Sequence, residues 1–155
     1  MTKQNLTLPK NCHLRPATAK DIWQIRKLVF GAKLDPTQLR YQQFWVIESE
    51  NKIVACGQLR TFEKAQELGS LVVASAWRNR GLGTFLSKHL IREAIAPLYL
   101  ECLGKNLEKF YTRLGFVTIS WEELPQSLKF KFGLSEMGRK LLKIPVVLME
   151  YRGVK

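Results

Sequence analysis

The stretch LVVASAWRNRGLGT, residues 71–84, decides the fold of this chain. An apolar run ends at Val73, a basic turn with glycines follows, and a helical pattern begins at Gly81. The first amides of a helix have no partner within it, and the helix dipole adds partial positive charge there. Because glycines let phosphates approach the backbone and Arg78 and Arg80 add charge, the stretch predicts a diphosphate-binding turn.

Two common phosphate-binding patterns do not fit this turn. The P-loop pattern GxxxxGK[ST] is absent, and the dinucleotide pattern GxGxxG fails because Leu86 stands where its last glycine would be. The alternative interpretation is a glycine-rich turn whose arginines are simply solvated. On spacing alone, both interpretations remain open.

Hydrophobic periodicity predicts a mixed α/β sheet in the order β-αα-βββ-α-β-α-β-β. The expected strands cover residues 12–15, 44–48, 52–61, 67–73, 98–102, 116–119 and 145–151. The expected helices run from Thr18 or Asp21 to Lys33, and over residues 36–41, 81–94 and 106–114. Residues 120–144 carry the weakest pattern, with a loop expected at 122–132 and a helical turn or two at 135–142.

Length and composition indicate a single globular domain. The chain has 155 residues, and we expect a loose leader at residues 1–11 and one domain at residues 12–155. The first ten residues are polar, unlike a secretory signal, and no apolar run reaches the ~20 residues of a membrane span. Three scattered cysteines and two histidines do not form a zinc pattern, so no metal is expected and the cysteines predict a reducing, cytoplasmic setting.

The net charge of +12 makes an anionic partner plausible. Nucleic acid, an anionic surface and an anionic cofactor or substrate would all fit, as would a basic protein kept dispersed by its charge. The excess is spread along the chain, and no helix-turn-helix or RNA-recognition pattern is present. Nucleic acid is therefore disfavoured as a partner.

Three segments give the chain a family resemblance. RNRGLG at residues 78–83 fits the pattern [RQ]-x-x-G-x-[GA], LRPAT at 14–18 precedes Asp21, and FYTRLGF spans 110–116. In this order, the motifs resemble those of the GNAT superfamily of N-acetyltransferases. The similarity covers about residues 12–119 and extends to the last expected strand.

The resemblance implies that acetyl-CoA binds between two splayed parallel strands, residues 67–73 and 98–102. It implies direct attack of a primary amine on the thioester, with CoA as the leaving thiolate. The residues it assigns to the cofactor are Leu71, Val73, Arg78, Asn79, Arg80, Gly81, Leu82, Gly83, Thr84 and Asn106. Asn106 departs from the family, because it stands five residues before Tyr111 where relatives have seven, and it could equally be a helix N-cap.

The resemblance also implies an acid and a base. Tyr111 holds the position of the family's proton donor to the leaving sulfur, although it could be a core aromatic beside Phe110 and Phe116. Glu67 lies where some members carry a glutamate that acts through water. The alternative for Glu67 is an exposed carboxylate at a strand start. Asp21, Glu63 and Glu101 are weaker candidates for the base, and backbone carbonyls with ordered water could also serve.

The predicted function is an acetyl-CoA-dependent N-acetyltransferase, an acyltransferase acting on an unknown amine of a small molecule or a protein. A catalytically silent acyl-CoA-binding regulatory module is the alternative. The acceptor cleft is expected at about residues 22–41 and 120–144, where Lys33, Arg40, Lys129 and Lys131 would suit an acidic acceptor. A monomer or a homodimer is expected.

Overall fold

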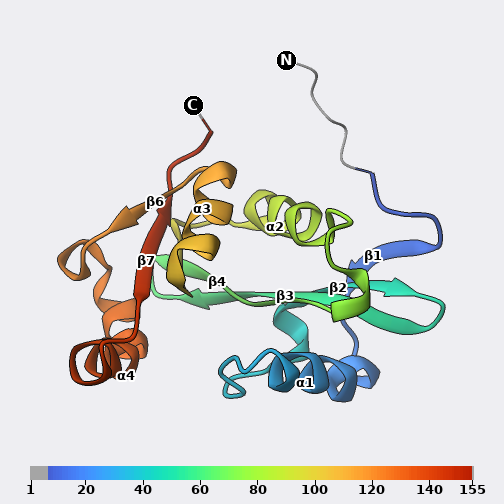
Figure 1. The fold of residues 1–155 in the computed structure, drawn as a ribbon, viewed down its shortest axis with the longest axis horizontal. Coiled ribbons are helices and arrows are strands. Elements are labelled where there is room, and N and C mark those ends of the chain that lie inside the picture. The colour runs from blue at the N-terminus through green and yellow to red at the C-terminus, as the bar shows by residue number, and fades with distance from the viewer. Residues whose placement is uncertain (1–6, 155) are drawn as a thin grey trace. The chain divides into compact units, whose positions relative to one another are not determined.

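The structure, a computed structural model, describes residues 7–154, without the side chains of residues 134, 135, 138 and 139. Part of the predicted leader, residues 1–6, lies outside the described residues, and residues 7–11 form a loop and a turn before the first strand (Figure 1). The chain divides into two compact units. The first unit holds the residues up to Leu59 and Ser70–Glu93, and the second holds Arg60–Gly69 and the residues from Ala94 onward.

The strands and α-helices follow one another in the order β1-α1-β2-β3-β4-α2-β5-α3-β6-α4-β7. The strands are β1 (Cys12–Pro16), β2 (Phe44–Ser49), β3 (Lys52–Phe62), β4 (Ala65–Val73), β5 (Leu98–Leu103), β6 (Phe116–Ile119) and β7 (Val146–Tyr151). The helices are α1 (Ile22–Gly31), α2 (Leu82–Glu93), α3 (Gly104–Leu114) and α4 (Gln126–Leu142). Short 3₁₀ turns stand at Ala19–Asp21, Tyr41–Gln43, Ser75–Trp77 and Trp121–Glu123.

Hydrogen bonds join the described strands into a mixed sheet in the order β1-β2-β3-β4-β5-β7-β6. β4 and β5 are parallel, pairing Gln66 with Leu98 and Glu67 with Tyr99, whereas β5 and β6 each pair with β7 in antiparallel fashion. The predicted mixed α/β fold is therefore confirmed. The predicted separation of β4 from β5 beyond these two pairs involves residues of both units, and it stays a prediction.

In the first unit, α1 and α2 cover opposite faces of β2 and β3 (Figure 1). The alternation of β2 sends Phe44 and Val46 toward Ile25 of α1, and all three side chains are at most 1% exposed. Trp45 points the other way, where its ring lies 4.1 Å from that of His89 on α2. Both faces of this part of the sheet are thus closed by helices.

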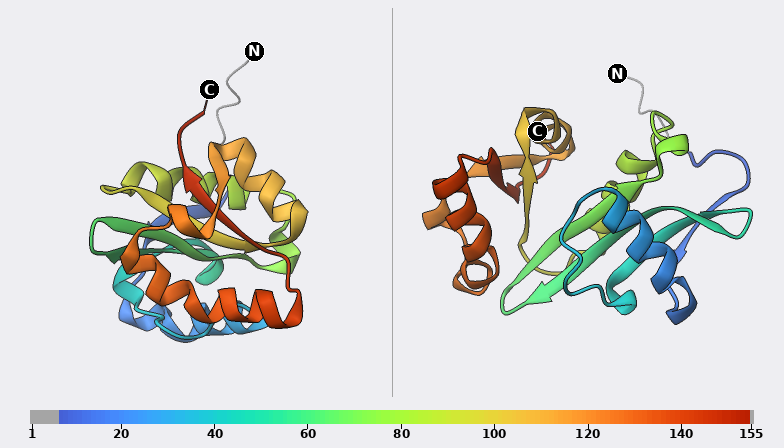
Figure 2. Two further views of the ribbon diagram at one scale, coloured as in Figure 1. Left: turned by 90° about the vertical axis from the view of Figure 1, so that its left-hand side faces the viewer. Right: turned by 60° about the horizontal axis from the view of Figure 1, so that its bottom comes forward.

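The second unit repeats this arrangement with α3 and α4 (Figure 2). On one face, Leu128 and Phe132 of α4 pack with Tyr99 and Leu148, all buried. Cys102 follows Glu101 on β5 and therefore points to the other face, where α3 lies. Each face of this part of the sheet thus meets its own helix.

The helix predicted at residues 36–41 is wrong. After Pro36, the backbone N–H and the hydroxyl of Thr37 both donate to Asp35 Oδ1, at 2.8 and 2.6 Å. Gln38 then takes a left-handed φ of 58°, which a helix does not allow. A local side-chain turn thus outcompetes helix formation, and a 3₁₀ turn follows at Tyr41–Gln43.

The loop predicted at residues 122–132 is also largely wrong, because α4 begins at Gln126. Leu124, Leu128 and Phe132 recur every four residues, and each is at most 4% exposed. The exposed Phe130 and two lysines between them hide this spacing in the sequence. Pro125 stands at the N-cap, and Lys143, with φ of 53°, ends the helix.

The cysteines Cys12, Cys56 and Cys102 are all free and buried. Burial raises the pKa of Cys56 to about 12 and that of Cys102 to about 11, so both remain neutral thiols. None of the helices in the described part of the chain combines the length and apolar character that a membrane span needs.

Candidate functional site

The predicted phosphate turn connects β4 to α2 in the first unit. Asn79 and Gly81 both have left-handed backbones, with φ of 63° and 80°. Leu82 opens α2 and is 1% exposed, which anchors the helix start in the core. Residues 78–81 are exposed, and Gly83 and Thr84 are half-buried. The turn therefore presents the unpaired amides of α2 on an accessible surface, as a phosphate site requires.

The two arginines of the turn have different partners. Arg78 Nε donates a hydrogen bond to the carbonyl of Val73, at 3.3 Å. The Arg80 guanidinium lies over the indole of Trp77, with its Cζ 4.6 Å from the ring centroid. Both charges therefore stay within the turn, one held by the backbone and the other by an aromatic ring.

The predicted pantetheine strand carries an irregularity just before Leu71 and Val73. Ser70, inside β4, has a left-handed φ of 51°, a backbone that interrupts the regular pleat as a β-bulge does. On a regular strand, Glu67 would lie on the same face as Leu71 and Val73, because every second residue shares a face. The irregularity at Ser70 shifts this alternation, so the spacing alone does not place them on one face. Leu71 and Val73 are half-buried.

Tyr111 lies on α3 in the second unit and is 7% exposed. Its ring makes edge contacts with Phe110 and Phe116, with centroids 4.9 and 5.7 Å apart. Burial raises the pKa of Tyr111 far above its ordinary value, and the nearby Cys102 adds to the rise. The phenol therefore keeps its proton at physiological pH, as a proton donor must.

Glu67 lies in a buried ion cluster of the second unit. Its side chain is 2% exposed and accepts hydrogen bonds from Arg60 of β3 and Lys131 of α4. Gly69 leaves room for this pair, because a Cβ there would lie 2.7 Å from Arg60 Nη1. Burial lowers the pKa of Lys131 and the Glu67 carboxylate opposes that shift. The expected alternative for Glu67, an exposed carboxylate, is wrong.

Tyr111 and the Glu67 cluster belong to opposite faces of the second unit. The charge of Glu101 acts on Lys131, whereas Tyr111 lies near Cys102. Glu101 and Cys102 are neighbours on β5, so their side chains point to opposite faces of the sheet. The predicted acid therefore lies on the α3 face and the predicted base on the α4 face.

The sequence missed two features of this region. Asn106 is the third residue of α3 and is exposed, and Leu103 is the N-cap, so the N-cap alternative for Asn106 is wrong. Arg60 was not expected to bind Glu67, although a charged residue at a buried position of a largely apolar strand is a signal for such pairing.

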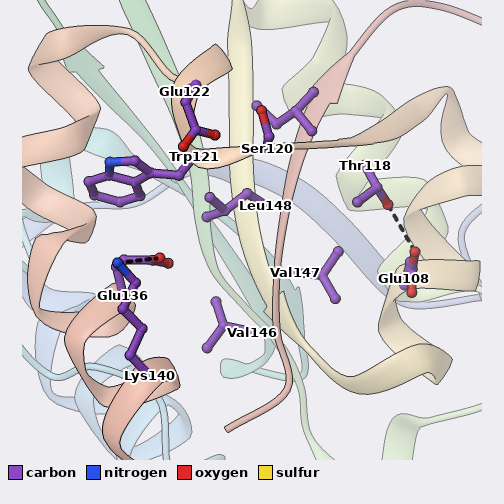
Figure 3. A pocket seen from close by; sticks show the side chains of 11 residues that line it. Glu108, Thr118, Ser120, Trp121, Glu122, Glu136, Lys140, Val146, Val147 and Leu148 are labelled. Carbon is purple, nitrogen blue, oxygen red and sulfur yellow. Dashed lines mark hydrogen bonds and ion pairs between the residues drawn. The ribbon is translucent and has the colours of Figure 1, made fainter. Parts of the chain in front are cut away.

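A cavity of about 450 Å³ opens in the second unit between the sheet and its helices (Figure 3). Its walls include Trp121, Glu136, Lys140 and Glu108, whose carboxylate accepts a hydrogen bond from Thr118 at 2.9 Å. None of the predicted catalytic or cofactor residues lines it, whereas Trp121, Glu136 and Lys140 belong to the segment 120–144 that was expected to border the acceptor. Within residues 7–154, no group of three or more His, Cys, Asp or Glu side chains could hold a metal ion.

The sequence of this chain matches a known protein family. The family model for the acetyltransferase (GNAT) domain matches residues 40–118, which include the phosphate turn, β4, β5 and α3. This chain belongs to the GNAT acetyltransferase family. The family expected from the sequence motifs is thereby confirmed, and the roles of the individual residues stay predictions.

The GNAT chain is similar to segments of longer proteins. An amino-acid acetyltransferase of Neisseria meningitidis serogroup A is 30% identical over 89 residues, covering 55% of this chain and 20% of that protein. An amino-acid acetyltransferase of Buchnera aphidicola is 29% identical over 115 residues, covering 71% and 26%. The chain thus spans between a fifth and about a quarter of the length of these relatives.

Solved structures share the fold of the GNAT chain. The N-acetylglutamate synthase of Neisseria gonorrhoeae, in complex with coenzyme A and N-acetyl-glutamate, superposes with a TM-score of 0.73 at 22% identity. The match covers 91% of this chain and 35% of that one. At this level of identity, the likeness concerns the fold.

Proposed function

We propose that this protein is an acetyl-CoA-dependent N-acetyltransferase that transfers an acetyl group directly to a primary amine. The observation that carries the proposal is the turn at residues 78–84, where exposed arginines, a left-handed Gly81 and the free amides of α2 meet in a GNAT chain. Backbone N–H groups and a helix dipole both favour a pyrophosphate. The proposed cofactor residues are the backbone of Leu71 and Val73, the turn from Arg78 to Thr84, and Asn106.

The transfer requires an uncharged amine and a proton for the sulfur. The amine nitrogen attacks the thioester carbonyl carbon and a C–N bond forms. The C–S bond then breaks with its electron pair on sulfur. We assign Tyr111 as the acid that gives its phenol proton to this thiolate, and the proton lost by the nitrogen returns to Tyr111 through solvent. Burial keeps Tyr111 in its protonated form at neutral pH, which a proton donor requires.

Glu67 is our proposed base, acting through water. Arg60 and Lys131 already engage both of its carboxylate oxygens, so a water must reach a remaining lone pair or displace one cation. The alternative keeps Glu67 as the centre of the ion cluster and leaves deprotonation to backbone carbonyls and ordered water. The two routes differ in the pH dependence of a Glu67 variant.

The proposed acceptor is the amine of an amino acid or a similarly small molecule. Two relatives are named amino-acid acetyltransferase, and the solved N-acetylglutamate synthase holds N-acetyl-glutamate. The net charge of +12 favours an acceptor that carries a carboxylate over a polycation. A protein amine remains the second class of acceptor.

We further propose that residues 12–155 form one catalytic domain, that residues 1–11 precede it as a leader, and that the protein works in the cytoplasm. The free cysteines Cys12, Cys56 and Cys102 support a reducing compartment. A monomer or a homodimer is proposed as the oligomeric state, with acetyl-CoA and the amine as partners.

The testing experiment combines binding with turnover. Calorimetry with acetyl-CoA comes first, because both the enzyme and the silent regulatory module require binding. Release of free CoA thiol is then followed with a panel of amino acids, other small amines and peptides, using Tyr111→Phe as the matched variant. Thiol release with one acceptor class supports the enzyme. Binding without release from any amine supports the silent module, and no binding overturns both.

A further inference from the structure

The aromatic residue before the phosphate turn is in direct contact with one of its arginines. Trp77 ends the 3₁₀ turn Ser75–Trp77, where its backbone N–H donates to the carbonyl of Ala74 at 2.8 Å. The Arg80 guanidinium lies 4.6 Å from the indole centroid, within the ~6 Å range of a cation–π contact. Trp77 is half-buried and Arg80 is exposed, so the ring is the more fixed member of the pair.

The backbone of the turn explains why these two residues meet. Asn79 and Gly81 flank Arg80, and both have left-handed backbones. The chain therefore folds back over so short a distance that residue 80 reaches the side chain of residue 77. Arg78 instead donates to the Val73 carbonyl, so the two arginines of the turn are held in different ways.

A stacked guanidinium keeps its hydrogen-bonding capacity. The indole contacts its face, whereas its N–H groups lie in its plane and point outward from the edges. An exposed arginine normally loses much rotamer freedom when it binds an anion. A stack formed beforehand reduces that loss, which is the general advantage of preorganisation.

We propose that Trp77 is a positioning residue of the cofactor site. It holds Arg80 over its ring so that the guanidinium edge receives a phosphate group of acetyl-CoA. This inference rests on the proposed function, because the ligand is the cofactor proposed there. The phosphate is either part of the pyrophosphate or the 3′-phosphate, and both share the chemistry that Arg80 recognises.

A double-mutant cycle tests the coupling. Calorimetric affinity for acetyl-CoA is measured for the wild type, Trp77→Ala, Arg80→Ala and the double variant. We expect Trp77→Ala to weaken binding about two- to fivefold, the worth of an exposed cation–π pair, and to have no further effect in Arg80→Ala. The matched control cycle pairs Trp77 with Arg78, and there the effects should be additive because Arg78 is held by the backbone.

Further measurements separate the sources of failure. If the wild type does not bind acetyl-CoA, the proposed function fails before Trp77 is tested. If the wild type binds but Trp77→Ala has no effect, or an equal effect with and without Arg80, Trp77 is not a positioning residue. Trp77→Phe keeps an aromatic face and should bind nearly as the wild type, and it replaces Trp77→Ala in the cycle if thermal melts show that the alanine variant is unfolded.

A second ligand identifies the phosphate. 3′-Dephospho-CoA retains the pyrophosphate and lacks the 3′-phosphate. If the Trp77–Arg80 coupling persists with this ligand, Arg80 receives the pyrophosphate, and if it disappears, Arg80 receives the 3′-phosphate. Coupling that is absent with both ligands overturns the proposal.

Discussion

The two units hold their candidate residues in different ways. In the first unit, the candidates run almost consecutively from Leu71 to Thr84, and backbone features dominate, namely the left-handed Gly81 and the free amides of α2. In the second unit, Glu67 meets Arg60 and Lys131, which come from two other elements far apart in the sequence. A site made of backbone follows from one local pattern, whereas a side-chain cluster depends on how the chain packs.

Exposure separates the two regions as well. Residues 78–81 face solvent, whereas Glu67 and Arg60 are 2% and 5% exposed. Changes of the exposed side chains in the turn should therefore alter ligand affinity with little effect on folding. Changes in the cluster should act on stability first.

Replacing Glu67 by glutamine tests whether the ion cluster acts on stability, and we expect the largest effect from this variant. The variant keeps the side-chain shape but removes the carboxylate charge that faces Arg60 and Lys131. Breaking a buried ion pair from one side costs about 3–5 kcal/mol, which urea unfolding followed by circular dichroism should detect. Lys131→Met is the matched control, and it should cost less because the pair between Arg60 and Glu67 remains.

A different outcome would assign Glu67 to catalysis. If Glu67→Gln unfolds like the wild type and instead abolishes the acidic limb of the pH–rate profile, Glu67 serves as the base. The contrast between an affinity region and a stability region would then be wrong.

Tyr111→Phe should lower turnover by about 100-fold, the low end for general acid catalysis, because thiolates are fairly good leaving groups. The ring contacts with Phe110 and Phe116 survive in this variant, so thermal stability and acetyl-CoA affinity should change little. The measurement is thiol release with the acceptor found in the amine panel. Full turnover in a variant that binds acetyl-CoA normally would make Tyr111 a packing residue.

The pH dependence of the wild type follows from the pKa of Tyr111. Burial raises this pKa above its ordinary value of 10, so the acid form persists as pH increases. We therefore expect no loss of turnover from Tyr111 below about pH 10. A descending limb near pH 8 that disappears in Tyr111→Phe would contradict the raised pKa.

Asp21 offers a stability test inside the first unit, away from the phosphate turn in sequence. Arg15 donates to both of its oxygens, at 2.7 and 3.0 Å, and lowers its pKa from 3.8 to about 2. Because the folded pKa is the lower one, the stabilisation is full above pH 3.8 and is lost as pH falls through about 2. It amounts to roughly 2 kcal/mol.

Thermal unfolding between about pH 2 and 7 measures this contribution. The wild type should lose stability more steeply than Asp21→Asn below about pH 4, since the variant has no carboxylate to protonate. Equal slopes for the two proteins would mean that the ion pair with Arg15 contributes nothing. Acetyl-CoA affinity at pH 7 serves as the control and should be retained in the variant.

The sequence predicted most elements of the fold because their periods are local. The alternation in β2 and the helical spacing in α2 each lie within a dozen residues. The errors occurred where another interaction overrode the local pattern. Asp35 turned residues 36–41 away from a helix, and burial of Leu128 and Phe132 produced α4 from a segment with weak periodicity.

In the candidate site, too, the features that follow from a local sequence pattern were predicted, and those that depend on contacts were not. The turn was predicted because Arg78, Gly81 and Gly83 stand together in one motif, and the structure gives Gly81 the left-handed backbone that only glycine adopts freely. The partners of Glu67 were not predicted, because no local signal joins residues 60, 67 and 131. The contact of Trp77 with Arg80 depends on two left-handed residues that sequence spacing does not reveal.

Gly83→Val gives the smallest expected effect and tests the backbone half of the comparison. Gly83 is the second residue of α2, where the ordinary helical backbone accepts a side chain, so valine should not lower thermal stability. The branched side chain would stand at the helix start, where phosphates must approach the amides, and acetyl-CoA binding should weaken at least tenfold, about 1.4 kcal/mol. Gly81→Ala is the contrasting control, because its φ of 80° makes any side chain strained and should lower stability too. Unchanged calorimetric affinity in folded Gly83→Val would mean that the phosphates bind away from α2.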